Sequence, residues 1–274
     1  MNLRALLWRV HWLLSDQVGI DLRKMFRLFV GLPRYVRDYL RFRSGYNGRI
    51  EFLPCLHDWY EEGGATKLEY FWQDLLVARK IFAARPERHV DIGSRVDGFV
   101  AHVASFREIE VFDVRPISTQ VPGVVFRQAD FMQPATGMTD CCDSLSCLHA
   151  LEHFGLGRYG DPIDPLGFER GFTNMAKVLK QGGTFYLSLP IGIGRVEFNG
   201  QRVLEPQAII RLAGEHALEM IELTLIRQGG ELETLLPDAA RLAELARQRY
   251  ALGLFTFVKR TKAQAPALLN PAPG

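Results

Sequence analysis

The spacing of apolar residues divides the chain into a helical head and an alternating body. In residues 1–45, apolar side chains recur three and four positions apart before and after Pro33, which predicts two short amphipathic helices. Residues 66–83 repeat the helical spacing, and Thr66 is the expected N-cap of that third helix. From residue 88 onward, short apolar runs alternate with helical stretches, as expected for strands joined by helices.

The alternation in the body predicts a parallel sheet covered by helices. Strands are expected at 88–93, 109–115, 124–130, 143–151, 183–191, 218–227 and 251–260. Helices are expected at 97–106, 168–180, 206–213 and 237–248. Such alternation is typical of doubly wound sheets with buried strands. The predicted fold class is therefore α/β: a doubly wound, Rossmann-like, mostly parallel seven-stranded sheet with an N-terminal helical extension, in which one of the last two strands can be reversed.

The same pattern sets the domain boundaries. At roughly 100–200 residues per domain, the chain holds one full domain with an extension. We assign residues 1–65 to a basic helical extension and residues 66–262 to the sheet domain. Residues 263–274 are rich in Pro and Ala and are predicted to form a disordered tail.

Charge separates the head from the body, although the net charge of +2 looks neutral. Residues 1–50 hold ten Lys and Arg against three Asp, so the head carries +7 and the remainder −5. A basic amphipathic head either lies on an anionic membrane surface or packs on the body and exposes its arginines to water. No nucleic-acid reader motif accompanies the charge, so we expect no nucleic-acid partner.

The four cysteines predict a reducing compartment. Cys55, Cys141, Cys142 and Cys147 form no C-x-x-C pair, and no histidines stand at zinc spacing, so we expect no metal site. No uninterrupted apolar run of about 18 residues predicts a transmembrane helix, and the first residues do not resemble a signal peptide. The expected location is the cytoplasm, and if residues 1–45 lie on a membrane, the surface is the inner membrane face.

The end of the first predicted strand carries the first candidate binding residues. Ligands of open α/β sheets bind outside the carboxyl ends of the strands. There the sequence reads Asp91, Ile92, Gly93, Ser94 and Arg95. A glycine at this point lets the backbone approach a ligand closely, and the following helix presents free N–H groups.

Two further strand ends are acidic and complete a predicted nucleoside pocket. Asp113 ends the second strand, at a spacing from Asp91 suited to binding both hydroxyls of a ribose. Asp130 ends the third strand and can accept from an adenine amino group, while the neighbouring Phe131 stacks on the base. Each acidic strand end alone is more often a turn former or a cap. Together they favour a nucleoside cofactor.

These strand ends carry a family resemblance. Residues 88–191 resemble the class I methyltransferases that use S-adenosyl-L-methionine, through DIGSR (91–95), FDVRP (112–116), QAD (128–130), LEHF (151–154) and LKQGGTFYLSLP (179–190). The Gly-Gly of the last motif also suits a helix C-cap. Roughly residues 45–230 resemble a small bacterial and nematode family of uncharacterised function, through YFWQDLLVARKI, DIGSRVDGFVAHV, SLSCLHALEHFGLGRYGDPIDPLG and FNGQRV (198–203). The resemblance implies a methyltransferase with S-adenosyl-L-methionine as cofactor, and some bacterial members are associated with surface-polysaccharide biosynthesis.

The glycine loop departs from the methyltransferase pattern. Of three alternating glycines only Gly93 is kept, because Arg95 and Asp97 stand at the second and third positions and Gly98 is displaced. Arg95 either pairs directly with the carboxylate of the cofactor's methionine or blocks the site. Asp97 beside that carboxylate is unfavourable unless it faces away.

The loop after the fourth strand supplies the candidate catalytic residues. O-methylation requires a base for the acceptor hydroxyl, and His149, His153 and Glu152 form the predicted catalytic set, with His149 first and His153 second. In the resembling enzymes the Leu-Glu-His triplet is also a structural joint, and that alternative stays open.

The rest of this loop and the FNGQR segment supply further candidates. Asp161 and Asp164 either hold a divalent metal with Glu152 or form a Pro-braced turn, which the spacing favours. Candidate substrate contacts on this side of the sheet are Arg158, Tyr159, Asn199 and Arg202.

Two hypotheses of different classes follow. In the first, the protein is an S-adenosyl-L-methionine-dependent methyltransferase that acts on a hydroxyl of a glycan or small molecule. In the second, it is a non-catalytic Rossmann-like module that binds a nucleoside or no ligand and serves as an assembly or regulatory partner. The loop at 93–98 distinguishes the two hypotheses. Arg95 replaces the missing glycine contacts in the first and obstructs the cofactor in the second.

Overall fold

The computed structural model describes residues 7, 10–134, 137–227 and 229–260. Its contacts divide the chain into two units, Met1–Ala65 and Thr66–Gly274, called here the N-terminal unit and the sheet unit. The predicted disordered tail, 263–274, lies outside the described residues.

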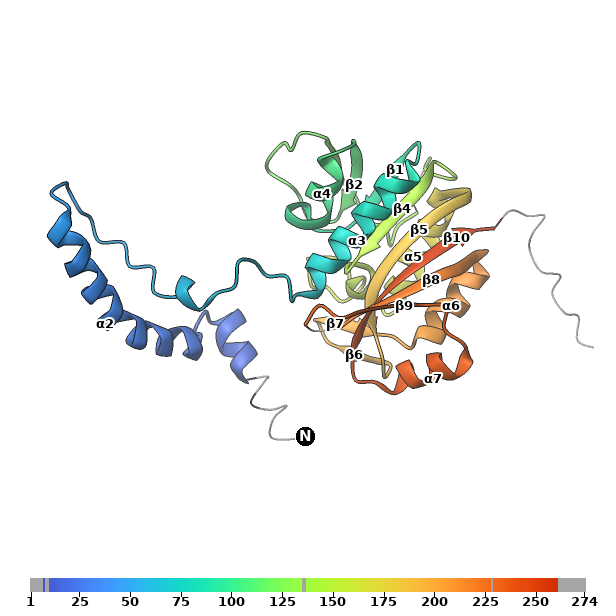
Figure 1. The fold of residues 1–274 in the computed structure, drawn as a ribbon. Helices are drawn as coiled ribbons and strands as arrows, with labels where there is room; N and C mark the ends of the chain where they lie inside the picture. The colour runs from blue at the N-terminus through green and yellow to red at the C-terminus, as the bar shows by residue number, and fades with distance from the viewer. Residues whose placement is uncertain (1–6, 8–9, 135–136, 228, 261–274) are drawn as a thin grey trace, which may run out of the picture. The chain divides into compact units, whose positions relative to one another are not determined.

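The N-terminal unit is built around one long helix, α2 (Leu22–Gly45), shown in blue in Figure 1. The Asp21 side chain caps it by accepting hydrogen bonds from the backbone N–H groups of Arg23 and Lys24. The prediction that Pro33 separates two helices is wrong, since α2 runs through it; the proline removes one backbone donor without ending the helix. Of the helix expected nearer the start, the described part is helical over residues 10–17.

A return segment, residues 46–65, packs along one side of α2. It contains a short 3₁₀ turn, η2 (Asp58–Tyr60), and places Leu56 against Gly31, the one buried residue of α2. The Arg34 guanidinium lies 3.7 Å from the ring centroid of Trp59. These contacts cover only one side of the helix.

The sheet unit confirms the predicted fold class. Its eight-stranded sheet has the order β3-β2-β1-β4-β5-β10-β8-β9. The strands are β1 (His89–Ile92), β2 (Ile109–Asp113), β3 (Val124–Gln128), β4 (Cys142–Leu148), β5 (Leu179–Ile191), β8 (Leu218–Ile226), β9 (Leu232–Leu235) and β10 (Ala251–Lys259). The first five are parallel. β10 is the reversed member of the last predicted pair, because it is antiparallel to both β5 and β8, and β9 is also antiparallel to β8. The eighth strand, β9, is the one that sequence reasoning missed.

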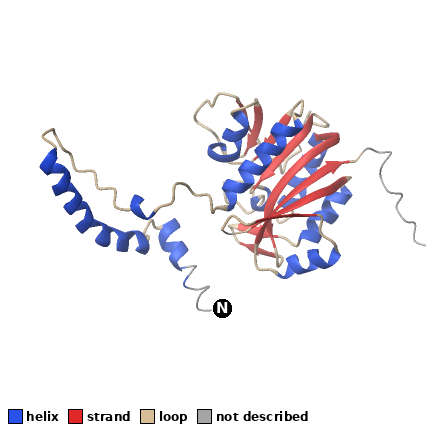
Figure 2. Cartoon of the chain, in the orientation of Figure 1, coloured by secondary structure: helices blue, strands red, loops and turns tan. Residues whose placement is uncertain are grey.

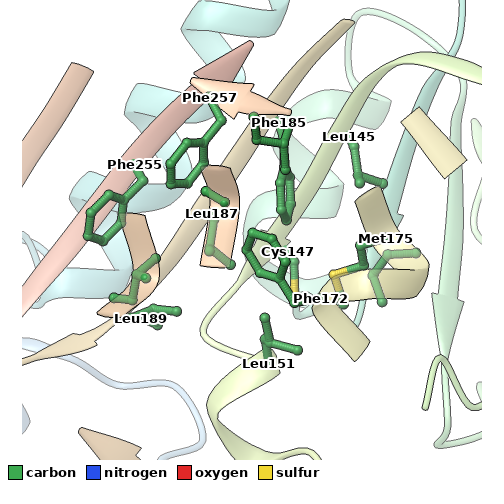
Figure 3. Packing of buried hydrophobic residues seen from close by; sticks show 14 of the residues in the cluster. Leu145, Cys147, Leu151, Phe172, Met175, Phe185, Leu187, Leu189, Phe255 and Phe257 are labelled. Atoms are coloured by element: carbon green, nitrogen blue, oxygen red, sulfur yellow. The ribbon is translucent and has the colours of Figure 1, made fainter. Parts of the chain in front are cut away.

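Helices cover both faces of this sheet (Figures 1 and 2). On one face lie α3 (Glu69–Ala84), the π-helical turn η3 (Val96–Val100) and α4 (Ala101–Ala104). On the other lie α5 (Gly167–Val178), α6 (Pro206–Glu215) and α7 (Ala239–Arg247). Figure 3 shows part of the second core, in which Phe172 and Met175 of α5 meet Phe185 of β5 and Phe257 of β10. Because successive side chains of a strand point to opposite faces of the sheet, these strands contribute to two separate apolar layers, one on each face.

Two local predictions are wrong, and one hairpin was not predicted. Thr66 is not an N-cap: α3 begins at Glu69, and the Thr66 carbonyl instead accepts from the Trp72 indole N–H at 2.8 Å. Gly182 and Gly183 do not cap α5, because Leu179 already leaves the helical conformation to fill the core, and Gly182 serves the turn inside β5 at φ +78°. The segment containing FNGQR forms an unpredicted hairpin of β6 (Arg195–Glu197) and β7 (Gln201–Val203).

Candidate functional site

A cavity of about 390 Å³ opens at the carboxyl ends of the parallel strands. Gly93 follows β1, Asp113 ends β2, Asp130 follows β3 and His149 follows β4, and all four line it. Parallel strands bring their carboxyl ends to one edge, which is why residues far apart in sequence meet here. The cavity falls within the range of about 300–1,000 Å³ that small-ligand sites occupy.

Eight of the ten predicted site residues line the cavity. They are Gly93, Ser94, Arg95, Asp113, Asp130, Phe131, His149 and His153. The other two, Asp91 and Glu152, are fully buried and lie behind its wall, where they bond to residues of the first group.

The backbone conformation at position 93 requires a glycine. The φ of Gly93 is +75°, and a Cβ there would lie 2.8 Å from the Cβ of Ala150. Its N–H donates to the carbonyl of Phe112 at 2.7 Å, which ties the turn to the neighbouring strand β2. The turn therefore brings bare backbone to the cavity wall, as the strand-end argument expects.

Asp91 supports this turn rather than facing the cavity. One of its carboxylate oxygens accepts from the Ser94 backbone N–H at 3.0 Å, and the other accepts from the Ser94 and Ser146 hydroxyls at 2.7 and 2.5 Å. Burial raises the pKa of Asp91 to about 7, despite these serine bonds. Because Ser94 Oγ also accepts from the Leu148 N–H, Asp91 links the ends of β1 and β4.

The buried network continues along the same two strands. His89 stands in register with Ser144, and Asp91 with Ser146. The two ring nitrogens of His89 contact the Ser144 and Ser146 hydroxyls at 2.8 and 3.1 Å. Burial lowers the pKa of His89 to about 3, so its ring is neutral. A polar ladder thus runs beneath the cavity on the sheet face covered by α3.

Asp113 lines the cavity but is held by Arg115. The Arg115 Nη2 lies 2.5 Å from one Asp113 oxygen, and its Nε lies 3.0 Å from the other. The guanidinium also lies over the Tyr159 ring, 4.4 Å from its centroid. The carboxylate predicted to take ribose hydroxyls is therefore already paired inside the chain.

Arg95 and Asp97 form a second pair at the cavity mouth. Their side chains are 65% and 71% exposed and are joined at 2.6 and 3.0 Å. The hydrogen bond from Arg95 lowers the pKa of Asp97. Arg95 is thus paired with Asp97, and the two side chains neutralise each other at the second and third glycine positions of the methyltransferase pattern.

A local hydrogen bond and core packing fix the two residues, Asp130 and Phe131, that lie just after β3. One Asp130 oxygen accepts from the Met132 N–H at 2.9 Å, as in an Asx turn. Phe131 is only 3% exposed and makes an edge contact with Phe112, with ring centroids 5.5 Å apart. Asp130 keeps a carboxylate at the cavity, whereas most of the Phe131 ring belongs to the core.

His149 and Glu152 form a buried dyad. His149 Nδ1 lies 2.7 Å from Glu152 Oε1, and the His149 ring packs 4.7 Å from that of Tyr70. Burial alone would raise the pKa of Glu152, but His149 and His153 hold it below its ordinary value. The carboxylate therefore accepts from Nδ1–H. The remaining nitrogen, Nε2, is buried with no partner in the described part of the chain, which leaves its lone pair available.

His153 has the contacts of a structural residue that connects two segments of the chain. Its Nδ1 lies 2.7 Å from the Gly200 carbonyl, which also accepts from Arg158 at 2.8 Å. Burial lowers the pKa of His153 even though Glu152 acts in the opposite sense. The ring thus connects the 3₁₀ turn η4 (Leu151–His153) to the β6–β7 hairpin.

Arg202 holds the loop after β4 in place through hydrogen bonds to its backbone. Its guanidinium is buried, and it donates to the carbonyls of Phe154 at 2.6 Å and Glu152 at 3.3 Å. Burial lowers the pKa of Arg202. Arg202 is thus a structural residue of the loop rather than a wall of the cavity, whereas Arg158 and Tyr159 do line it.

The two acidic residues of the DPIDP segment organise turns. Asp161 accepts from the backbone N–H groups of Gly155 and Gly157 at 2.8 and 3.3 Å. Asp164 accepts from the Leu166 N–H and pairs with Arg170 at 2.8 Å. No cluster of three potential metal ligands occurs among the residues that the structure describes.

Helix α3 contributes cavity residues that sequence reasoning missed: Tyr70, Gln73 and Asp74. They precede Val77 and Ile81 on the same helical face, so this face is polar in its first turns and apolar further on. That change of polarity is the signal that could have found them. The displaced Gly98 accommodates Asp74, because a Cβ there would lie 2.5 Å from Asp74 Oδ2.

Comparison with known proteins gives one family match. The model described as "Caenorhabditis protein of unknown function, DUF268" matches residues 124–217, from β3 to the turn after α6. This stretch lies within the region for which the sequence resembles a family of uncharacterised function. No curated protein matches the chain.

Solved structures with a similar chain path include methyltransferases. The putative methyltransferase in the Haloferax volcanii Trm112 activator complex is 16% identical with a TM-score of 0.47, covering 70% of this chain and 91% of its own. The Burkholderia thailandensis 1,6-didemethyltoxoflavin-N1-methyltransferase, with S-adenosylhomocysteine, is 12% identical with a TM-score of 0.49, covering 74% and 81%. The Bradyrhizobium japonicum N-methyltransferase NodS, also with S-adenosylhomocysteine, is 17% identical with a TM-score of 0.47, covering 74% and 92%.

None of the helices in the described part of the chain is long and apolar enough to span a membrane.

Proposed function

We propose that the sheet unit is an S-adenosyl-L-methionine-dependent methyltransferase that methylates a hydroxyl of a glycan or other small molecule. The observation that carries this proposal is the His149–Glu152 dyad in the wall of a cavity that also presents Gly93 and Asp113. Five Asp and three Arg line this cavity, an excess of negative charge that favours a cationic ligand.

The residues present fit the cofactor. The Gly93 turn leaves the space that a Cβ would fill, and Asp113 and Asp130 offer carboxylates at adjacent strand ends. Asp113 would hold the ribose hydroxyls once Arg115 releases it, and Asp130 would face the adenine. When bound, the cofactor supplies a methyl group on a positively charged sulfur.

His149 is the base for the acceptor hydroxyl. Glu152 keeps Nδ1 protonated and thereby leaves the buried Nε2 free to take the proton. The resulting imidazolium is stabilised by the Glu152 carboxylate at 2.7 Å. Tyr70 packs on this ring, and burial raises its pKa to about 12, so it stays neutral and does not compete as a base.

Calorimetric titration of the full chain with S-adenosylhomocysteine tests the cofactor assignment. Saturable binding is expected, and Asp113→Ala should remove it. Absence of binding at millimolar ligand would sink the proposal, because no methyl donor would then have a site.

Methyl transfer tests the base. With radiolabelled S-adenosyl-L-methionine and fractionated glycans or small molecules as acceptors, His149→Gln should lower the rate by roughly 10²–10⁴-fold. Binding of S-adenosylhomocysteine by that variant should be unchanged. Equal rates for wild type and His149→Gln would contradict the assignment of the base.

A non-catalytic module is the second candidate, and one observation favours it. Asp113 and Arg95 are both paired within the chain, to Arg115 and Asp97. If these pairs persist in solution, the cavity binds no nucleoside, and the titration described above gives no heat.

A further inference from the structure

Helix α2 carries an exposed apolar stripe from Leu22 to Leu40. Its members recur three or four positions apart, so they share one side of the helix. They are Leu22, Met25, Phe26, Phe29, Leu32, Val36 and Leu40. Each is between 46% and 69% exposed, although such residues ordinarily face a core.

The return segment does not cover this stripe. It contacts other sides of α2, placing Leu56 against Gly31, Trp59 under Arg34 and Tyr60 under Arg27. Phe26 and Phe29 therefore present most of their rings outward, each 69% exposed.

A basic face borders the stripe. The helix holds seven Lys and Arg, with Asp38 as its single acidic residue. At 100° per residue, the arginines of this face gather on the side next to the stripe. They are Arg23, Arg27, Arg34, Arg37 and Arg41.

We infer that α2 is an interfacial helix that lies in the surface of an anionic membrane. Its apolar stripe would enter the boundary between headgroups and acyl chains, and its exposed arginines, Arg23, Arg37 and Arg41, would contact the lipid phosphates. Arg27 and Arg34 stack on Tyr60 and Trp59 instead. Charge decides between occupants: an anionic surface attracts this helix, whereas a second copy would bring two strongly basic helices together. The inference rests on the N-terminal unit alone and is independent of the proposed methyl transfer.

Flotation of the full chain with vesicles tests the inference. The chain should float with phosphatidylcholine vesicles that contain phosphatidylglycerol, and much less with phosphatidylcholine alone. Phe26→Ala with Phe29→Ala should lower the partition coefficient roughly hundredfold. Neutralising Arg23 and Arg41 to Gln should lower it roughly thirtyfold at low salt.

The matched control is Phe42→Ala. Phe42 is the same residue type on the same helix and is 60% exposed, but it lies far around the helix from Phe26. This variant should float like wild type, and circular dichroism of all variants should match. Equal flotation of wild type and the double Phe variant would overturn the inference. So would a wild-type dimer that binds no vesicles and becomes monomeric on the double substitution, because the stripe would then belong to a second copy.

Discussion

Arg115 holds Asp113 through two of its nitrogens, at 2.5 Å and 3.0 Å, and Asp113 is the carboxylate that the proposed function assigns to the ribose hydroxyls. The Tyr159 ring, which also lines the cavity, packs against the guanidinium. A nucleoside that enters the cavity must therefore exchange two charge-assisted hydrogen bonds for its own. This exchange weakens binding by the free energy of the Arg115–Asp113 pair.

Removing the arginine should therefore tighten binding. Arg115→Gln is expected to bind S-adenosylhomocysteine about three- to tenfold more tightly, since a partly exposed pair is worth about 1 kcal/mol. Calorimetry measures this, with Arg127→Gln, an exposed arginine outside the cavity lining, as the control. Weaker binding by Arg115→Gln would show that the arginine itself contacts the ligand.

Gly93→Ala should destabilise the sheet unit. The substitution combines a left-handed backbone with a Cβ 2.8 Å from Ala150, so a loss of about 2–4 kcal/mol in the free energy of unfolding is expected. Gly182→Ala is the matched control, because its φ of +78° is similar but nothing lies within 4 Å of the added Cβ. Urea denaturation should show a loss of only about 1 kcal/mol for Gly182→Ala. Equal losses would mean that the contact with Ala150 is relieved by movement.

The buried Asp91 should make stability depend on pH. Its pKa is raised from 3.8 to about 7, so its folded state binds the extra proton between these values. This contribution to stability is complete below the ordinary pKa and is lost as the pH rises through about 7. Relative to wild type, Asp91→Asn should therefore gain stability steadily from about pH 4 to pH 7, as measured by thermal unfolding. A difference that is constant across this window would mean that Asp91 is ionised throughout.

His89 should act in the opposite sense. Its pKa is lowered to about 3 from 6.5, so the unfolded state binds the extra proton and stability is lost as the pH falls below 6.5. Relative to wild type, His89→Gln should gain stability toward low pH over that window in the same thermal measurement. A difference that grows toward neutral pH would contradict the neutral, buried ring.

Arg202 should control the order of the loop at 149–167. Arg202→Met leaves the carbonyls of Phe154 and Glu152 without their donor, at an expected cost of about 2–4 kcal/mol. Amide hydrogen exchange in the loop should accelerate accordingly. Arg211→Met, at an exposed position of α6, should change neither property. Unchanged exchange in Arg202→Met would show that the Pro-braced turns hold the loop unaided.

Much of the fold and the location of the site could be predicted from the sequence. Buried parallel strands appear in the sequence as apolar runs. Their carboxyl ends lie at the same edge of the sheet, independently of the conformation of the loops. For this reason Asp113, Asp130 and His149 could be assigned to one cavity without coordinates. β9 was missed because a short, half-exposed edge strand carries little periodic signal.

Side-chain direction at the site could not be predicted. Asp91 and Asp113 look equivalent in the sequence, yet Asp91 bonds to Ser94 inside the sheet face and Asp113 reaches the cavity. Which acidic residue an arginine pairs with depends on turns of two residues, as in Asp113–Arg115 and Arg95–Asp97. Such pairs need atomic positions, because sequence spacing allows several partners.

Helix α3 lines the cavity and packs in the core with different residues, so that ligand preference and stability can be varied separately. Its first turns supply Tyr70 and Asp74 to the cavity, and its later turns supply Val77 and Ile81 to the core. A library that varies residues 70, 73 and 74 would explore ligand preference while the later turns keep the helix docked. The helix is thus a natural starting point for changing the ligand preference of the cavity by directed evolution.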